Sequence, residues 1–137
     1  MVIWLIGISG AGKTTLGIRV EAYLKSQNKN CYMIDGDDIR KLFDNDLGYT
    51  RDERVQNSKR IILAGYVLEQ SGAVPIIFNI SPFEALRKLA RRKLDSYNEI
   101  YLNKTIETSK KNGSMNQLGY IVDSLCCWAN SLENAAS

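Results

Sequence analysis

Histidine is absent from the 137-residue sequence, and with it the side chain that most often serves as a general base or a metal ligand near neutral pH. Any acid–base chemistry must therefore come from carboxylates, lysine, tyrosine or cysteine. Cysteine is scarce: there are three, an odd number, and two of them are adjacent. Because this set makes a poor disulfide framework, we expect reduced, structural thiols of the kind found in the cytoplasm.

Long apolar runs are missing as well. The opening run at 2–6 spans five residues and leads directly into a glycine-rich loop, and no run in the sequence approaches the length of a membrane-spanning helix. A signal peptide would need a basic start, a longer apolar region and a cleavage site. We therefore expect a cytoplasmic protein without a membrane partner.

The sequence also has little excess of charge of one sign. Lys and Arg number 18 against 15 for Asp and Glu, which gives a net charge of +3. Dedicated nucleic-acid binding usually requires a denser basic stripe, so no nucleic-acid partner is expected. The length suits one domain, and no internal repeat or low-complexity segment divides it. We predict a single domain over 1–137.

Short apolar runs alternate with helical patterns along the chain. Strands are expected at 2–6, 31–34, 73–80 and 99–102, and helices at 13–26, 39–43, 51–70 and 81–97. A short helix after 104, then a strand and a helix within 118–133, complete the pattern. Continuous apolar strands that alternate with helices are typical of a parallel sheet covered on both faces. The predicted fold is α/β, a three-layer α/β/α sandwich with a mostly parallel central sheet.

Residues 7–15 read GISGAGKTT and match the phosphate-loop pattern G-x-x-x-x-G-K-[ST] between an expected strand and an expected helix. In such a loop, backbone N–H groups and the helix N-terminus converge on phosphate. The lysine, Lys13, reaches the β- and γ-phosphates, and the Thr14 hydroxyl joins the magnesium shell. We predict that ATP phosphates are bound by Gly10, Ala11, Gly12, Lys13, Thr14 and Thr15.

Two other classes that use this loop fit the sequence less well. The N-K-x-D motif by which GTPases of this class read the base does not occur, and a motor ATPase would normally need a longer chain. The small size and an acidic segment after the second strand favour a small-molecule kinase.

The acidic segment is Asp35-Gly36-Asp37-Asp38, and it follows the expected strand at 31–34. Ligands of open parallel sheets bind at this edge, where the glycine loop also lies. A carboxylate near an acceptor hydroxyl can orient it, accept its proton or hold magnesium through water. Without histidine, Asp37 or Asp35 is the natural candidate. The alternative is an acidic turn that caps the next helix, with Asp37 or Asp38 as the cap.

Four segments in series, GISGAGKTT, IDGDDIR, LGYTRDERVQNSKR and NISPF, resemble the adenylylsulfate kinase family over about residues 1–102. That family typically shows a P-loop, then D-G-D-x-[IV]-R, L-G-F-S-x-x-D-R-x-x-N-x-x-R and I-S-P-[YF]. The resemblance implies a P-loop kinase-like fold, a homodimer, and ATP- and magnesium-dependent phosphorylation of the 3′-hydroxyl of a small-molecule nucleotide acceptor, adenosine 5′-phosphosulfate.

The resemblance also implies roles for single residues. Asp37 matches the aspartate proposed as the base at the acceptor hydroxyl, with Asp35 in support, and whether it instead serves magnesium is left open. The acceptor nucleotide would be bound by Asp35, Asp37, Arg40, Tyr49, Arg54, Asn57, Ile80 and Ser81. In this set the two arginines and the asparagine hold the phosphosulfate, since a planar guanidinium grips tetrahedral oxyanions. The tyrosine stacks on the base, and the last two residues line the pocket. A role for Arg60 stays open.

Two departures from the family pattern affect the choice of acceptor. Glu84 replaces the first arginine of S-P-[YF]-R-x-x-R, which indicates either a different acceptor or a change at the surface. The family's lid segment, R-D-x-K-G-L-Y-x-K-A-R, is missing, and Lys110 and Lys111 lie near the matching place without reproducing it. Because lids exclude water and complete such sites, its loss should lower kinase activity or leave slow ATP hydrolysis.

Three functions therefore stay open. The first is adenylylsulfate kinase activity. The second is a kinase for another 5′-substituted nucleotide, such as a cytidine-diphosphate-linked group used in surface polysaccharide synthesis. The third is a catalytically weak nucleotide-binding module with a regulatory role. The basic residues at 87–93 are interpreted as a solvated helix face, and Cys126 and Cys127 as packing residues of a C-terminal helix.

Overall fold

The computed structural model describes residues 1–7, 10, 12–80 and 83–102. The predictions for Ala11, for Ser81, for the lid region and for the elements and cysteines beyond 104 lie outside the described residues.

The described part of the chain contains one parallel sheet. Its strands are β1 (Val2–Ile6), β2 (Cys31–Asp35), β3 (Val74–Asn79) and β4 (Tyr97–Tyr101). They lie in the order β2-β3-β1-β4, and every neighbouring pair is parallel. The two inner strands, β1 and β3, are the most apolar and the most buried, because helices cover both of their faces.

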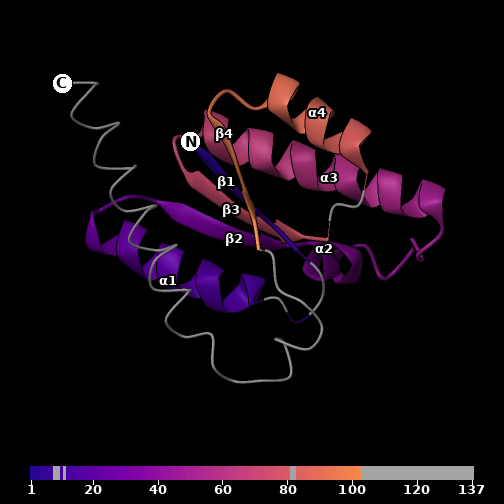
Figure 1. Ribbon diagram of the computed structural model, residues 1–137, viewed down its shortest axis with the longest axis horizontal. Coiled ribbons are helices and arrows are strands. Elements are labelled where there is room, and N and C mark those ends of the chain that lie inside the picture. Colours follow the sequence, from indigo (N-terminus) through magenta and orange to yellow (C-terminus); the bar gives the residue numbers. More distant parts are fainter. Residues whose placement is uncertain (8–9, 11, 81–82, 103–137) are drawn as a thin grey trace.

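Helices cover the sheet on both sides (Figure 1). Helix α1 (Lys13–Ser26) lies on one face, and α3 (Arg51–Gln70) and α4 (Glu84–Lys93) lie on the other. Side chains of β1 alternate between the two layers, as they must in a strand. Ile3 and Leu5 pack with α1, whereas Trp4 packs with α3 and α4. The three-layer α/β/α fold predicted from the sequence is confirmed.

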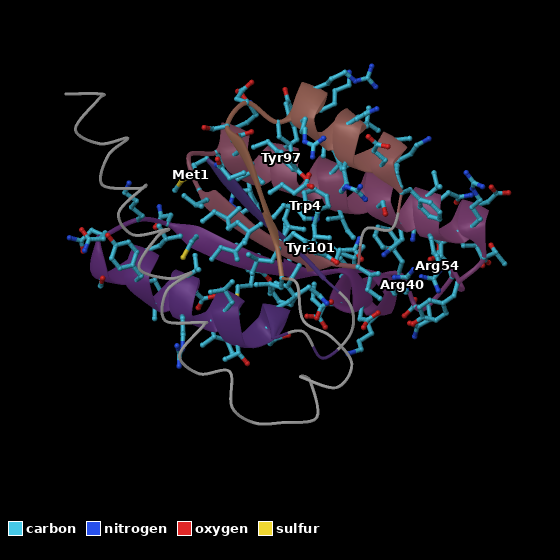
Figure 2. The ribbon with its side chains drawn as sticks, viewed as in Figure 1. Met1, Trp4, Arg40, Arg54, Tyr97 and Tyr101 are labelled. Atoms are coloured by element: carbon cyan, nitrogen blue, oxygen red, sulfur yellow. The ribbon has the colours of Figure 1, made fainter. Side chains whose placement is uncertain are left out.

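The contact between the edge strand β4 and β1 includes an aromatic pair (Figure 2). The ring centroids of Trp4 and Tyr97 are 5.8 Å apart, with a tilted arrangement that suits aromatic quadrupoles. This pair helps to hold β4 in parallel register with β1, where Trp4 lies opposite Glu99.

Helix α2 (Gly36–Leu42) begins earlier than the predicted 39–43. The Asp35 carboxylate accepts a hydrogen bond from the Asp37 N–H at 2.9 Å and caps this helix. The predicted cap, Asp37 or Asp38, is therefore wrong. Both of those residues belong to the first helical turn instead, where their charges suit the helix dipole.

The expected helix at 81–97 is too long at both ends. Phe83 is extended, so α4 begins at Glu84, and the chain leaves the helix at Leu94, whose side chain is buried in the core. The Glu69 carboxylate accepts hydrogen bonds from the next two backbone N–H groups, at 3.0 and 3.1 Å, and fixes the turn into β4. The strand thus starts at Tyr97 rather than at 99.

None of the helices among the described residues is both long and apolar enough to cross a membrane.

Candidate active site

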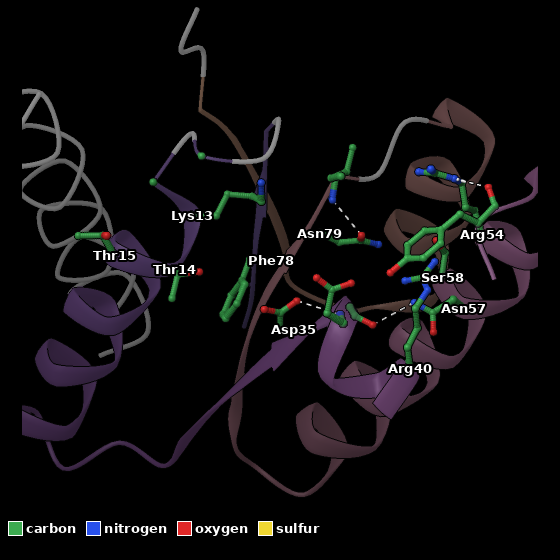
Figure 3. Close-up of a pocket in the computed structure, with 16 residues that line it drawn as sticks. Lys13, Thr14, Thr15, Asp35, Arg40, Arg54, Asn57, Ser58, Phe78 and Asn79 are labelled. Carbon is green, nitrogen blue, oxygen red and sulfur yellow. Dashed lines mark hydrogen bonds between the residues drawn. The ribbon is translucent and has the colours of Figure 1, made fainter. Parts of the chain in front are cut away.

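A cleft of about 420 Å³ lies at the edge of the sheet where the parallel strands end (Figure 3). Its lining comes from the glycine loop, the start of α1, the β2–α2 junction, the start of α3 and the end of β3. The residues are Gly10, Gly12, Lys13, Thr14, Thr15, Asp35, Gly36, Asp37, Arg40, Tyr49, Arg54, Asn57, Ser58, Phe78, Asn79 and Ile80.

The glycine loop forms one end of the cleft. Gly10 and Gly12 have φ of +78° and +93°, a conformation that other residues adopt only with strain, so glycine is required at both positions. Gly12 leads directly into α1, whose N-terminal N–H groups face the cleft end. The Lys13 Nζ donates a hydrogen bond to the Gly7 carbonyl at 2.6 Å, which keeps the ammonium group over the loop.

Opposite charges meet in the middle of the cleft. Burial lowers the pKa of Lys13 from its usual 10.5, and the negative charges of Asp35 and Asp37 act in the opposite direction. Burial also raises the pKa of Asp35 above its usual 3.8, against the effect of the hydrogen bond from the Asp37 N–H. Asp37 itself is exposed to the cleft. The lysine and the two carboxylates thus form one electrostatically coupled group.

Arginines and a tyrosine form the other end of the cleft. The guanidinium carbon of Arg40 lies 4.6 Å from the ring centroid of Tyr49, and that of Arg54 lies 5.5 Å from it. The Arg54 Nε also donates a hydrogen bond to the Tyr49 carbonyl at 2.8 Å. These contacts hold the Tyr49 ring at the rim, where it is largely exposed.

The floor of the arginine end contains two buried polar atoms without a hydrogen-bond partner among the described residues. They are the Nε of Arg40, which is 7% exposed, and the Oδ1 of Asn57, which is 1% exposed. Asn57 is held in place because its Nδ2 donates to the Gly36 carbonyl at 3.2 Å. Buried polar atoms are rarely left unpaired in folded proteins, so we infer that a bound ligand or water completes this end of the cleft.

All described residues that the sequence predicted for binding or catalysis line this one cleft. Their individual roles stay predictions. Sequence reasoning missed Gly36, Ser58, Phe78 and Asn79. Asn79 could have been found, because it opens the segment NISPF and ends a strand at the ligand-binding edge of the sheet.

Arg60, whose role the sequence left open, lies outside the cleft lining. Its guanidinium forms two hydrogen bonds with the Asp46 carboxylate, at 2.8 and 2.7 Å, and lies 4.1 Å from the ring centroid of Phe43. Arg60 therefore fixes the loop that carries Tyr49 instead of binding a ligand directly.

The residues of α4 also lie away from the cleft lining. Glu84 is exposed and pairs with Lys88 at 3.2 Å, which favours a surface change over a new acceptor contact. The interpretation of 87–93 as a solvated face is only partly right. Arg87 and Arg91 both form salt bridges with Glu99 of β4, at 3.6 and 2.6 Å, because α4 packs beside that strand.

The oxygen donors of the cleft suit a magnesium ion that arrives with nucleotide phosphates. In the described ranges, no group of three or more Asp, Glu or Cys side chains could hold a metal ion by itself. Magnesium usually keeps several waters and binds through one or two carboxylates plus substrate phosphates. The Thr14 hydroxyl and the Asp37 carboxylate, both lining the cleft, are donors of this kind.

A glycine loop with its lysine, followed by an acidic segment at the end of the next strand, defines a P-loop nucleotide-binding protein with a parallel sheet. Residues 1–116 match the adenylylsulphate kinase family, and the chain belongs to that family.

Curated relatives agree with this assignment. The chain is 41% identical over 90 residues to the adenylyl-sulfate kinase of Pseudomonas aeruginosa, which covers 66% of this chain and 46% of the relative. It is 32% identical over 108 residues to the bifunctional enzyme NodQ of Rhizobium meliloti, which covers 77% of this chain and 17% of the relative. The chain thus spans less than half the length of these two relatives.

A solved structure shares the fold. The Mycobacterium tuberculosis APS kinase CysC in complex with AMPPNP and APS superposes with a TM-score of 0.74 at 25% identity, over 85% of this chain and 70% of that one. The family and the fold predicted from the sequence are both confirmed.

Proposed function

We propose that this chain is an ATP- and magnesium-dependent kinase that phosphorylates the 3′-hydroxyl of adenosine 5′-phosphosulfate. The observation that carries the proposal is a single cleft with a phosphate loop at one end, two neighbouring carboxylates in the middle and, at the other end, two arginines that form no salt bridge among the described residues. Family membership supports it, as does a structural relative that is described in complex with AMPPNP and APS.

The glycine-loop end would bind the donor. Backbone N–H groups from Gly10 to Thr15 and the N-terminus of α1 would hold the β- and γ-phosphates, and Lys13 would neutralise their charge. Magnesium, when bound with ATP, neutralises further phosphate charge. Thr14 would hold that ion, and Asp37 would contact it only through water.

The middle of the cleft would carry out the transfer. The Asp37 carboxylate would orient the acceptor 3′-hydroxyl and take its proton. A bond forms between the 3′-oxygen and the γ-phosphorus, the bond from that phosphorus to the β–γ bridging oxygen breaks, and ADP leaves. Asp35 would support this step by fixing the backbone of Asp37 through the 2.9 Å hydrogen bond.

The arginine end would bind the acceptor's phosphosulfate. Arg40 and Arg54 form no salt bridge with any carboxylate among the described residues, so their charges are available to an anion. The ring of Tyr49 would stack on the acceptor base. A cytoplasmic location and a homodimer, both predicted from the sequence, stay predictions.

The experiment is an acceptor panel. The protein is incubated with ATP, magnesium and one 5′-substituted nucleotide at a time, and acceptor-dependent ADP and the phosphorylated product are measured. Turnover with adenosine 5′-phosphosulfate is the expected result. Turnover only with another nucleotide, such as a cytidine-diphosphate-linked group, would replace the proposed acceptor. ATP binding without turnover on any acceptor would instead indicate a catalytically weak nucleotide-binding module.

A further inference from the structure

Asn79, the last residue of β3, lines the cleft and has no part in the proposed phosphoryl transfer. In the sheet it pairs with Ile6, directly before the glycine loop, and its neighbour Phe78 pairs with Asp35. Asn79 therefore lies at the boundary between the donor half of the cleft and the acceptor half (Figure 3).

The orientation of the Asn79 amide is fixed by the backbone. The Ile80 N–H donates a hydrogen bond to the Asn79 Oδ1 at 2.8 Å. A backbone N–H can bond only to the oxygen of an amide, so the NH₂ group must form the other end of the side chain. Gly36 passes close to the amide: a Cβ at Gly36 would lie 3.1 Å from the same Oδ1. The oxygen end of the amide is thus fixed by the Ile80 N–H and lies close to Gly36 at the start of α2.

The Nδ2 of Asn79 is a free donor in the cleft. Across the described part of the chain, no oxygen accepts a hydrogen bond from it, and the side chain is only half-buried. In Figure 3 the side chain extends toward the half of the cleft in which Arg54 and Ser58 lie. A fixed and unused donor at that place is available to whatever occupies the acceptor half.

The chemistry of the Asn79 Nδ2 donor indicates which kind of ligand atom it would bind. The anionic part of an acceptor nucleotide is matched by Arg40 and Arg54, and its reacting hydroxyl by Asp37. A neutral amide N–H is suited to a neutral acceptor atom, such as a ring nitrogen or carbonyl of a base or a ribose oxygen. Sites built to hydrogen-bond such an atom reject analogues that lack it.

We propose that Asn79 is a specificity-determining residue of the acceptor site, and that its Nδ2 donates one hydrogen bond to the nucleoside part of the acceptor. The inference rests on the proposed function for the identity of the acceptor. Loss of one neutral hydrogen bond should weaken acceptor binding roughly five- to tenfold.

The test measures binding by calorimetry rather than turnover. Adenosine 5′-phosphosulfate and analogues that each lack one ring nitrogen or the ribose 2′-hydroxyl, all of equal charge, are titrated into the wild type, Asn79→Leu and Asn79→Asp. We expect one analogue to bind the wild type roughly five- to tenfold more weakly than the parent, and both variants to bind that analogue and the parent equally. Base analogues and the 2′-deoxy analogue distinguish a base contact from a ribose contact.

The two variants separate recognition from local structure. The Asp side chain retains an oxygen that can accept the hydrogen bond from the Ile80 N–H, whereas the Leu side chain has none. If Asn79 had a purely structural role, the ratio of the dissociation constants of analogue and parent would therefore be the same in Asn79→Asp as in the wild type. If the Asn79→Leu variant fails to fold, the Asn79→Asp variant still gives this ratio of dissociation constants. Unchanged ratios in a folded variant, or a wild type without preference for any analogue, would overturn the inference.

Turnover by the wild type is measured separately. If the wild type turns over the acceptor and the variants keep the wild-type ratio of dissociation constants, only the role of Asn79 is overturned. Acceptor binding with the ratio erased in the variants, but without turnover, overturns the proposed function and supports the role of Asn79. A wild type that binds no acceptor overturns both.

Discussion

Arg40 and Arg54 both approach the ring of Tyr49, so two positive charges lie close together at the acceptor end of the cleft. Like charges repel, and the buried Arg40 cannot relieve this repulsion by moving into water. The aromatic face offsets part of the repulsion, and a doubly charged anion between the guanidinium groups would offset more. This arrangement favours binding of an anionic acceptor.

Replacement of Arg54 by alanine should test this clustering. We expect the KM for adenosine 5′-phosphosulfate to rise by roughly ten- to a hundredfold, because a hydrogen bond to a charged group is worth about 1.5–3 kcal/mol. The KM for ATP should stay within about twofold, since Arg54 lies at the far end of the cleft from Lys13. Steady-state kinetics with each substrate varied in turn gives both values.

Lys59→Ala is the matched control, because Lys59 is an exposed cation on the same helix and does not line the cleft. An equal rise in the acceptor KM for Lys59→Ala would show a general effect of net charge and would contradict a specific role for Arg54.

At the scale of elements, the loop between α2 and α3 decides where Tyr49 lies. The Thr50 hydroxyl and the Glu53 carboxylate form a capping box at the start of α3. The hydrogen bonds from Thr50 lower the pKa of Glu53 below its usual 4.5. Farther along the helix, Arg60 holds the same loop through Asp46. The loop is therefore anchored to α3 at two places.

Loss of the Arg60–Asp46 pair should change the KM for the acceptor only. We expect Arg60→Met to raise the acceptor KM severalfold while the KM for ATP stays unchanged, because the loop at 44–50 carries Tyr49 but no part of the glycine loop. Kinetics at low and high salt would check the result, and the difference from wild type should shrink as salt screens the pair.

Arg92→Met on α4 serves as the control for Arg60→Met, since Arg92 is exposed and outside the cleft lining. An increase in both KM values for Arg60→Met would contradict a local effect on the loop.

The sequence predicted those elements best whose signals are local. The limits of α1 and α3 follow from a glycine loop, from Thr50 and from Gly72, and the inner strands follow from continuous apolar runs. The limits of α4 and β4 could not be found in this way. They depend on Glu69, which lies more than twenty residues earlier in the chain and bonds the backbone of the turn.

The same distinction holds for the candidate site. Motifs located the glycine loop, the two carboxylates and the arginines, which the structure brings into one cleft. Ser58 was missed because its place in the cleft depends on how α3 packs against the sheet in space, whereas Asn79 had a local signal at the end of its strand. The role of Arg60 was left open for a related reason: only the folded loop brings Asp46 to it.

At the scale of the whole molecule, Glu69 connects three parts of the fold. Its carboxylate, at the end of α3, accepts hydrogen bonds from the Asp95 and Ser96 N–H groups before β4. It also pairs with the Met1 amino group at 3.4 Å, beside β1. Burial acts to raise the pKa of Glu69, but these donors outweigh it, and the pKa lies below its usual 4.5.

Stability should depend on this carboxylate in a pH-dependent way. Because the pKa of Glu69 is lower in the folded state, the unfolded state binds more protons below pH 4.5, and the stabilisation is lost as the pH falls through the folded-state value. Glu69→Gln should lower the free energy of unfolding by about 1–3 kcal/mol at pH 7. The difference from wild type should shrink below pH 4.5, as urea denaturation at several pH values would show.

The control for Glu69→Gln is Glu84→Gln, which removes an exposed i,i+4 pair and should change stability by about 0.5 kcal/mol or less. A deficit for Glu69→Gln that is constant with pH would contradict the role assigned to the charge.

The proposed reaction depends on transfer of the γ-phosphoryl group from the donor end of the cleft to the acceptor end. The most direct measurement follows the labelled γ-phosphate of ATP in a single turnover with adenosine 5′-phosphosulfate and magnesium, for the wild type and for Asp37→Ala. We predict label on the acceptor's 3′-oxygen with the wild type, and retained ATP binding without transfer for Asp37→Ala. Label released only as inorganic phosphate, or transfer by Asp37→Ala at the wild-type rate, would contradict the proposed reaction.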